Sequence, residues 1–180
     1  MLEYCLIDTA IGSVGLAWSD RGLVRLQLPG PDRAATLDYL MGRADAIEAT
    51  PPAWLSETVE RLQRYFEGEP IDLSASPLDL DGVPEFHRRL YLEMLKLGWG
   101  ETVTYGELAE RVGAPGTAQA VGQAMGRNPV AVIVPCHRVL ASGNKMGGFS
   151  APGGTQTKRK LLEMEGVSIG ATAGQMAFAF

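Results

Sequence analysis

The stretch TYGELAERVGAPGTAQAVGQAMG, residues 104–126, decides the fold of the second half of the chain. Thr104 and Glu107 have the spacing of a helix-capping box, and a glycine follows the first helix where a helix commonly ends. After the turn at 114–116, residues 117–126 read as a second short helix. Two short helices joined by a tight turn predict a helix-turn-helix.

The second of these helices consists mostly of alanine and glycine. It has almost no long side chain able to reach base edges in a major groove. Small residues let a helix backbone lie close to another surface, so any DNA contact fits the narrow minor groove better. A plain packing role for the two helices remains an alternative at this point.

The helix-turn-helix is preceded by an amphipathic helix and, before that, by a first half that mixes strands and helices. PEFHRRLYLEMLKLG (84–98) places apolar residues on one helical face. In the first half, residues 11–20 and 22–28 read as two strands, and residues 33–40 and 50–68 read as helices. We therefore expect an α/β N-terminal domain, 1–80, with a small antiparallel sheet plus helix. A mostly α C-terminal domain, 81–180, would follow it, with a winged-helix-like helix-turn-helix.

The composition is that of an ordinary globular protein, with 180 residues of which 46% are hydrophobic and 21% charged. No apolar run predicts a membrane span, and the N-terminus does not resemble a signal peptide. Two cysteines imply no disulfide framework, which favours a reducing, cytoplasmic setting. Cys5, His87, Cys136 and His137 lack paired ligand spacing, so we expect no metal site.

Charge is distributed unevenly along the chain, whose net charge is −5. Residues 1–81 carry six Lys/Arg against fourteen Asp/Glu, whereas residues 82–180 carry ten against seven. The overall sign argues against a protein that coats nucleic acid indiscriminately, and the mildly basic second half is the part expected to face a polyanion.

The segment AVIVPCHRV (131–139) carries the chemistry. Its first four residues read as a buried strand, which Pro135 ends because proline cannot donate to a ladder. Cys136 then precedes His137, a base able to generate the thiolate, directly or through a water. Glu165, at the end of KRKLLEMEG, is the candidate carboxylate that fixes the histidine tautomer.

Two other interpretations of these residues stay open. Cys136 could be a packed core thiol and Glu165 a surface acid. A cysteine hydrolase would use the same Cys–His–acid set, but it needs an oxyanion hole, and the sequence shows no clear one.

NPVAVIVPCHRV (128–139) strongly resembles the active-site segment of the O6-alkylguanine-DNA alkyltransferases. The resemblance continues in GETVTYGELAERVG and AVGQAMGRNP before it and in GGFS…GG…K…LLEMEG after it. It covers residues 84–167 closely, whereas the first half resembles the family's smaller α/β domain only loosely.

The resemblance implies DNA repair by direct, stoichiometric and irreversible transfer of an alkyl group from O6 of guanine to Cys136. His137 would accept the thiol proton through a water, oriented by Glu165, and Tyr105 would donate a proton at N3 of the leaving guanine. Asn128 would tie the helix-turn-helix to the active-site strand. No metal or diffusible cofactor is required.

The resemblance also implies a partner, double-stranded DNA held through its minor groove by a monomer, with the damaged base flipped out. Ser150 lies in the loop that approaches O6, and Val139 lies near the flipped base. Arg127 and Arg138 would contact phosphates. The recognition helix would present Gln119, Ala120 and Gly122 to the DNA.

The sequence departs from the family pattern at several positions. Gln119 stands where an arginine usually fills the hole left by the flipped base, which predicts weaker duplex binding. Phe149 stands at a common tyrosine, Ala151-Pro152 resembles an insertion at the pocket rim, and Lys160 replaces a frequent tryptophan.

A damage-binding protein that recruits other repair factors is the alternative function. Alkyltransferase-like proteins of that kind have tryptophan at the cysteine position, so Cys136 favours transfer. The apolar tail, residues 171–180, would pack on the core or contact a neighbouring chain.

Overall fold

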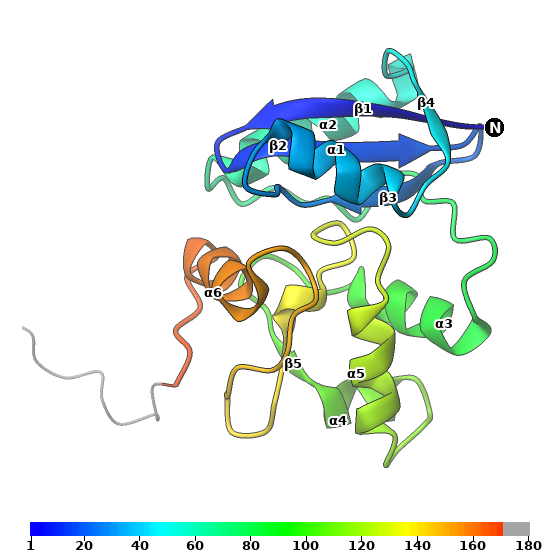
Figure 1. Ribbon diagram of the computed structural model, residues 1–180. Coiled ribbons are helices and arrows are strands. Elements are labelled where there is room, and N and C mark those ends of the chain that lie inside the picture. The colour runs from blue at the N-terminus through cyan, green and yellow to red at the C-terminus, as the bar shows by residue number, and fades with distance from the viewer. Residues whose placement is uncertain (171–180) are drawn as a thin grey trace, which may run out of the picture.

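The computed structural model describes residues 1–170, and the expectation for the tail at 171–180 lies outside them. A sheet with two helices forms one half of the molecule and a group of helices the other (Figure 1). In chain order the elements are β1 (Leu2–Thr9), β2 (Gly12–Trp18), β3 (Leu23–Gln27), α1 (Arg33–Met41), β4 (Ala46–Glu48), α2 (Ala53–Phe66), α3 (Glu85–Met94), β5 (Val103–Thr104), α4 (Tyr105–Arg111), α5 (Ala118–Gly126), a 3₁₀ turn (Cys136–Arg138), β6 (Val139–Leu140) and α6 (Gly154–Met164).

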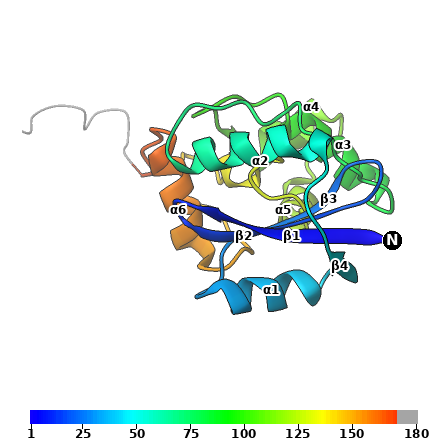
Figure 2. The same ribbon diagram turned by 90° about the horizontal axis from the view of Figure 1, so that it is seen from above.

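The N-terminal sheet has the order β3-β2-β1-β4, and its first three strands are antiparallel. The two strands expected from the sequence are confirmed as β2 and β3, joined by a turn in which Ser19 donates to the Gly22 carbonyl at 2.9 Å. β1 and β4 complete the sheet, and β4 pairs parallel to β1, so the sheet is mixed. Helices α1 and α2 lie on opposite faces of it (Figure 2).

Helix α2 packs one apolar stripe between the sheet and the second half of the chain. Leu55, Leu62 and Phe66 recur at helical spacing and are buried. Tyr65, at the end of the same helix, is completely buried as well. Burying side chains of this size stabilises the fold by about 1.5–3 kcal/mol each, so this stripe holds α2 in place.

The helix-turn-helix predicted from the sequence is present in the second half as α4 and α5, which pack on α3. The capping box is complete, because the Glu107 amide donates to Thr104 Oγ1 at 3.1 Å and the Thr104 amide donates to Glu107 Oε2 at 2.8 Å. The buried Tyr91 hydroxyl of α3 donates to the Ala124 carbonyl of α5 at 2.7 Å, which fixes α5 on α3.

The expectation of a buried strand at 131–134 is wrong. The segment is buried but forms only isolated bridges, and the Val134 amide donates to the Val130 carbonyl at 3.0 Å. Val132 has φ of 74°, a backbone conformation that is rare for a β-branched residue. Prolines at 129 and 135 remove amide donors at both ends, so a regular ladder cannot form.

Instead, this segment covers the outer edge of β3. The Leu26 amide donates to the Pro129 carbonyl at 2.9 Å, and Leu26 and Val130 form a parallel bridge. Further along the same edge, Leu23 exchanges hydrogen bonds with residues 77–79. The edge strand of the first half is thus closed by the residues that lead to Cys136.

Within residues 1–170, no helix is both long and apolar enough to cross a bilayer.

Candidate active site

Cys136 opens the 3₁₀ turn with its thiol almost completely buried, at 6% exposure, and unpaired. Asn128 holds the preceding segment, because its Nδ2 donates to the Val134 carbonyl at 2.8 Å and its Oδ1 accepts from the Val130 amide at 3.0 Å. Burial raises the pKa of the Cys136 thiol, against the hydrogen bond from Asn128 and the charge of Lys158, which both lower it. The resting thiol is therefore protonated and needs a base.

His137 is fully buried and lies against Glu165, with 2.8 Å between its Nε2 and Oε1 of the carboxylate. This contact assigns the proton to Nε2 and leaves Nδ1 as the acceptor nitrogen. Nδ1 is buried without a hydrogen-bond partner among residues 1–170. Burial lowers the pKa of His137 despite the carboxylate, so the imidazole is neutral and free to accept a proton.

Glu165 follows the last residue of α6 and is the most heavily hydrogen-bonded side chain of the site. Tyr65 Oη donates to its Oε1 at 2.5 Å, and the Arg138 guanidinium donates to both carboxylate oxygens, at 2.9 and 3.0 Å. The Gly100 amide adds a longer contact of 3.3 Å. Burial opposes ionisation, but the hydrogen bonds from His137, Arg138 and Tyr65 outweigh it and lower the pKa of Glu165 to about 2.

Arg138 differs from its expected role. The sequence suggested a phosphate contact, whereas the side chain is 8% exposed and its Nη1 donates to the Leu97 carbonyl at 2.6 Å. Its other donors are used by Glu165. The expected phosphate contact is therefore corrected. The guanidinium is buried, where it compensates the charge of the buried Glu165 carboxylate.

Lys158 and Tyr65 are site residues for which the sequence assigned no role. Lys158 lies inside the matched motif; its Nζ is fully buried and donates to the carbonyls of Val139, at 2.5 Å, and Gly148, at 3.3 Å. Burial lowers the pKa of Lys158 to about 8. The lysine of the matched motif was the only sign in the sequence of a role for Lys158, and Tyr65 offered none beyond a helical apolar face.

A cavity of about 700 Å³ opens beside Cys136 on the helix-turn-helix side. Tyr105, Gln119, Gly122 and Ser150 line it, as expected of residues that meet a base. Burial raises the pKa of Tyr105, which keeps its hydroxyl protonated. Its Oη lies so close to Gly147 that a Cβ there would be 2.5 Å away, so the loop requires glycine.

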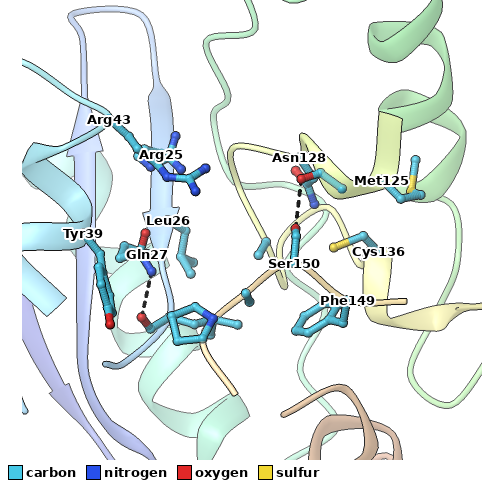
Figure 3. A pocket seen from close by; sticks show the side chains of 15 residues that line it. Arg25, Leu26, Gln27, Tyr39, Arg43, Met125, Asn128, Cys136, Phe149 and Ser150 are labelled. Atoms are coloured by element: carbon cyan, nitrogen blue, oxygen red, sulfur yellow. Dashed lines mark hydrogen bonds between the residues drawn. The ribbon is translucent and has the colours of Figure 1, made fainter. Parts of the chain in front are cut away.

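A second cavity, of about 270 Å³, runs between the two halves of the molecule (Figure 3). Cys136 and Ser150 lie on one wall, and Arg25 and Arg43 lie on the other, with Tyr39 further along. We call this cavity the interdomain groove. Both cavities therefore reach the thiol, from opposite sides of the loop that carries Phe149 and Ser150.

Besides Arg138, three of the expected DNA residues line neither cavity. Val139 is fully buried and pairs with Val103, so the expected side-chain contact with the base is corrected: the side chain is part of the core, and its carbonyl accepts a hydrogen bond from Lys158. Arg127 is exposed at the end of α5. Burial, and after it the charge of Arg127, lowers the pKa of His87. Ala120 is half-buried on α5.

Comparison with known proteins covers nearly the whole described chain. The family model for the DNA binding domain of 6-O-methylguanine DNA methyltransferase matches residues 85–167, and the model for its ribonuclease-like domain matches residues 2–80. The methylated-DNA--protein-cysteine methyltransferase of Mycobacterium leprae is 48% identical over 171 residues, with 92% of this chain and 93% of the relative covered.

Solved structures agree with the sequence comparison. The O6-methylguanine methyltransferase of Mycobacterium tuberculosis has a TM-score of 0.72 at 36% identity, over 95% of this chain and 97% of that one. The structure of the M. tuberculosis protein in complex with DNA has a TM-score of 0.73 at 38% identity, over 91% and 92% of the two chains. The chain belongs to the 6-O-methylguanine DNA methyltransferase family.

Proposed function

We propose that the protein repairs DNA by transferring the alkyl group of O6-alkylguanine directly and irreversibly to Cys136. The observation that carries this is the buried thiol beside a His–Glu pair whose free nitrogen, Nδ1 of His137, has no other partner among residues 1–170. The relatives that carry this activity in their names match over most of the chain. Transfer to the protein itself makes each molecule single-turnover.

The reaction begins when a flipped guanine enters the cavity beside the helix-turn-helix. His137 takes the Cys136 proton at Nδ1 through a bridging water, and Glu165 stabilises the imidazolium that results. The thiolate attacks the alkyl carbon in line with the C–O6 bond. That bond breaks, its electron pair leaves with the guanine, and the Tyr105 hydroxyl donates a proton to the base at N3.

The duplex is held through its minor groove by the small-residue face of α5. Gln119 and Gly122 lie on this face beside Tyr105, and a Cβ on Gly122 would lie 3.8 Å from the Tyr105 ring. Flipping a base requires a few kcal/mol of unstacking free energy. Gln119 offers hydrogen bonds to the orphaned partner base but no charge, and Arg127, exposed at the end of α5, supplies a cation to contact a phosphate.

We further propose that the protein acts as a monomer in the cytoplasm and consists of two domains, 1–80 and 81–180. The chemistry needs a reduced thiol, and both Cys5 and Cys136 are free. Residues 67–84 lie between α2 and α3 and contain no helix, which suits a boundary at this point.

Intact-mass measurement after incubation with a duplex that holds one O6-methylguanine tests the function. We expect the mass to rise by one methyl-for-hydrogen exchange, with no change in the Cys136→Ala variant. Binding to that duplex without a mass gain would instead identify a damage-binding protein.

A further inference from the structure

The interdomain groove has a positively charged wall that nothing in the described chain neutralises. The first half of the chain contains six basic residues, all arginines. Four of them form ion pairs, namely Arg21, Arg33, Arg61 and Arg64. The two without an ion pair among residues 1–170, Arg25 of β3 and Arg43 after α1, both line the groove (Figure 3).

The environment of Arg25 is unfavourable for an unpaired cation. Its Nε is buried and has no hydrogen-bond partner in the described residues. Burial and the neighbouring charge of Arg43 lower the pKa of Arg25 to about 10. A partly buried, unpaired guanidinium beside a second, exposed arginine destabilises the fold unless an anion binds between them.

The position of this pair relative to the thiol suggests which anion binds. In the proposed reaction the flipped base enters from the helix-turn-helix side and places its alkyl carbon between O6 and the Cys136 sulfur. Any further atoms of the alkyl group must occupy space beside that line. The interdomain groove supplies this space, because it shares Met125, Gly126, Phe149 and Ser150 with the base cavity and carries the two arginines on the wall opposite Cys136.

We propose that the interdomain groove receives the distal part of the alkyl group and that Arg25 and Arg43, on the wall opposite Cys136, bind a carboxylate carried by that group. The substrate class is thus O6-carboxyalkylguanine in DNA, in addition to small uncharged adducts. The inference rests on the proposed function. The reaction is unchanged: the S–C bond forms, the C–O6 bond breaks, the thiol proton goes to His137, and the guanine leaves protonated.

The test measures single-turnover transfer to Cys136 from duplexes that carry O6-carboxyalkylguanines of increasing chain length. Each carboxylate is matched with its primary carboxamide, which has nearly the same shape but no charge. At one or more chain lengths, we expect the carboxylate adduct to react about tenfold faster than the matched carboxamide. This is the size of effect that a charge-assisted hydrogen bond provides. The preference should decrease at high salt, because Arg43 is exposed.

The variants are Arg25→Gln, Arg43→Gln and the double variant, with Arg61→Gln as control because Arg61 is paired with Glu57 away from the groove. We expect the carboxylate-to-carboxamide ratio to fall toward one in the double variant and to persist in the control. A ratio is insensitive to general losses of folding or DNA affinity. Equal rates for carboxylate and carboxamide in the wild type overturn the inference.

Two further outcomes separate this inference from others. If the arginines bind DNA phosphates instead, the double variant slows every adduct equally, O6-methylguanine included, and the ratio does not change, which overturns the inference. If O6-methylguanine itself transfers nothing to the wild type, the proposed function fails rather than the substrate class.

Discussion

Tyr65 of α2 donates a hydrogen bond of 2.5 Å to Glu165, a residue 100 positions away in the other half of the chain. The same carboxylate oxygen, Oε1, also contacts His137 Nε2. A hydroxyl from the N-terminal half therefore shares the oxygen that orients the proposed base. This contact makes the first half of the chain part of the active site.

Replacing Tyr65 by phenylalanine should lower the transfer rate about tenfold, since a hydrogen bond to a charged group contributes roughly 1.5–3 kcal/mol. Oε1 becomes more basic without the hydroxyl and raises the pKa of His137. The acid limb of the pH–rate profile should accordingly move to higher pH, which a purely structural role would not cause. Tyr4→Phe, outside the site, is the control, and an unmoved acid limb would contradict the prediction.

The wild-type pH–rate profile should itself have an acid limb below pH 6.5. Burial lowers the pKa of His137 from the ordinary value of 6.5, so the neutral imidazole persists at mildly acidic pH. Activity is present above the folded-state pKa and is lost as pH falls through it. Single-turnover rates across this range would check it, and a midpoint above 6.5 would show that Glu165 dominates over burial.

Glu165 should make the fold sensitive to acid. Its pKa of about 2 in the folded protein lies below the ordinary 4.5, so the carboxylate stabilises the fold fully above pH 4.5. This contribution is lost as pH falls from 4.5 toward 2, where the unfolded state binds the proton first. Denaturant unfolding at several pH values should show this slope in the wild type. In Glu165→Gln it should be shallower, whereas Glu163→Gln, on the exposed side of α6, should retain it.

Lys158→Met should raise the pKa of the Cys136 thiol, because the buried ammonium favours the thiolate. It should also loosen the loop whose Gly148 carbonyl Lys158 holds. The pH dependence of Cys136 alkylation by iodoacetamide, followed by peptide mass, measures the first effect. Lys160→Met, an exposed neighbour, is the control. Equal alkylation profiles in both variants would rule out an electrostatic role for Lys158.

Gln119→Arg should bind duplex DNA more tightly. The arginine fills the space left by the flipped base, and its added charge, which offsets that of one phosphate, steepens the dependence of log affinity on log salt by about 0.9. Gln156→Arg adds the same charge on the exposed start of α6 and separates a local contact from a change in net charge. If both variants gain affinity equally, Gln119 does not lie against the DNA.

Local patterns predicted the elements of the fold well, because the capping box at Thr104 and Glu107 and the helix of residues 53–66 depend on near neighbours. Cys136 and His137 were identified from their own segment. Glu165 was expected as their partner, and the structure places it there.

The remaining features depend on contacts distant in sequence. Arg138 pairs with a carboxylate 27 residues away, and Tyr65 contacts one 100 residues away, so neither role leaves a local pattern. The left-handed backbone at Val132 could not be predicted from the sequence either, because a run of aliphatic residues normally predicts a strand.

The bridge between Leu26 and Val130 has a consequence for how such a protein can be divided. Cys136, His137 and Glu165 all belong to the second half of the chain, which might suggest a self-sufficient module. Removing the first half, however, would leave the Pro129 carbonyl and the Glu165 carboxylate without the donors that Leu26 and Tyr65 provide. A split version of the protein would therefore work only after its fragments reassociate and restore both contacts.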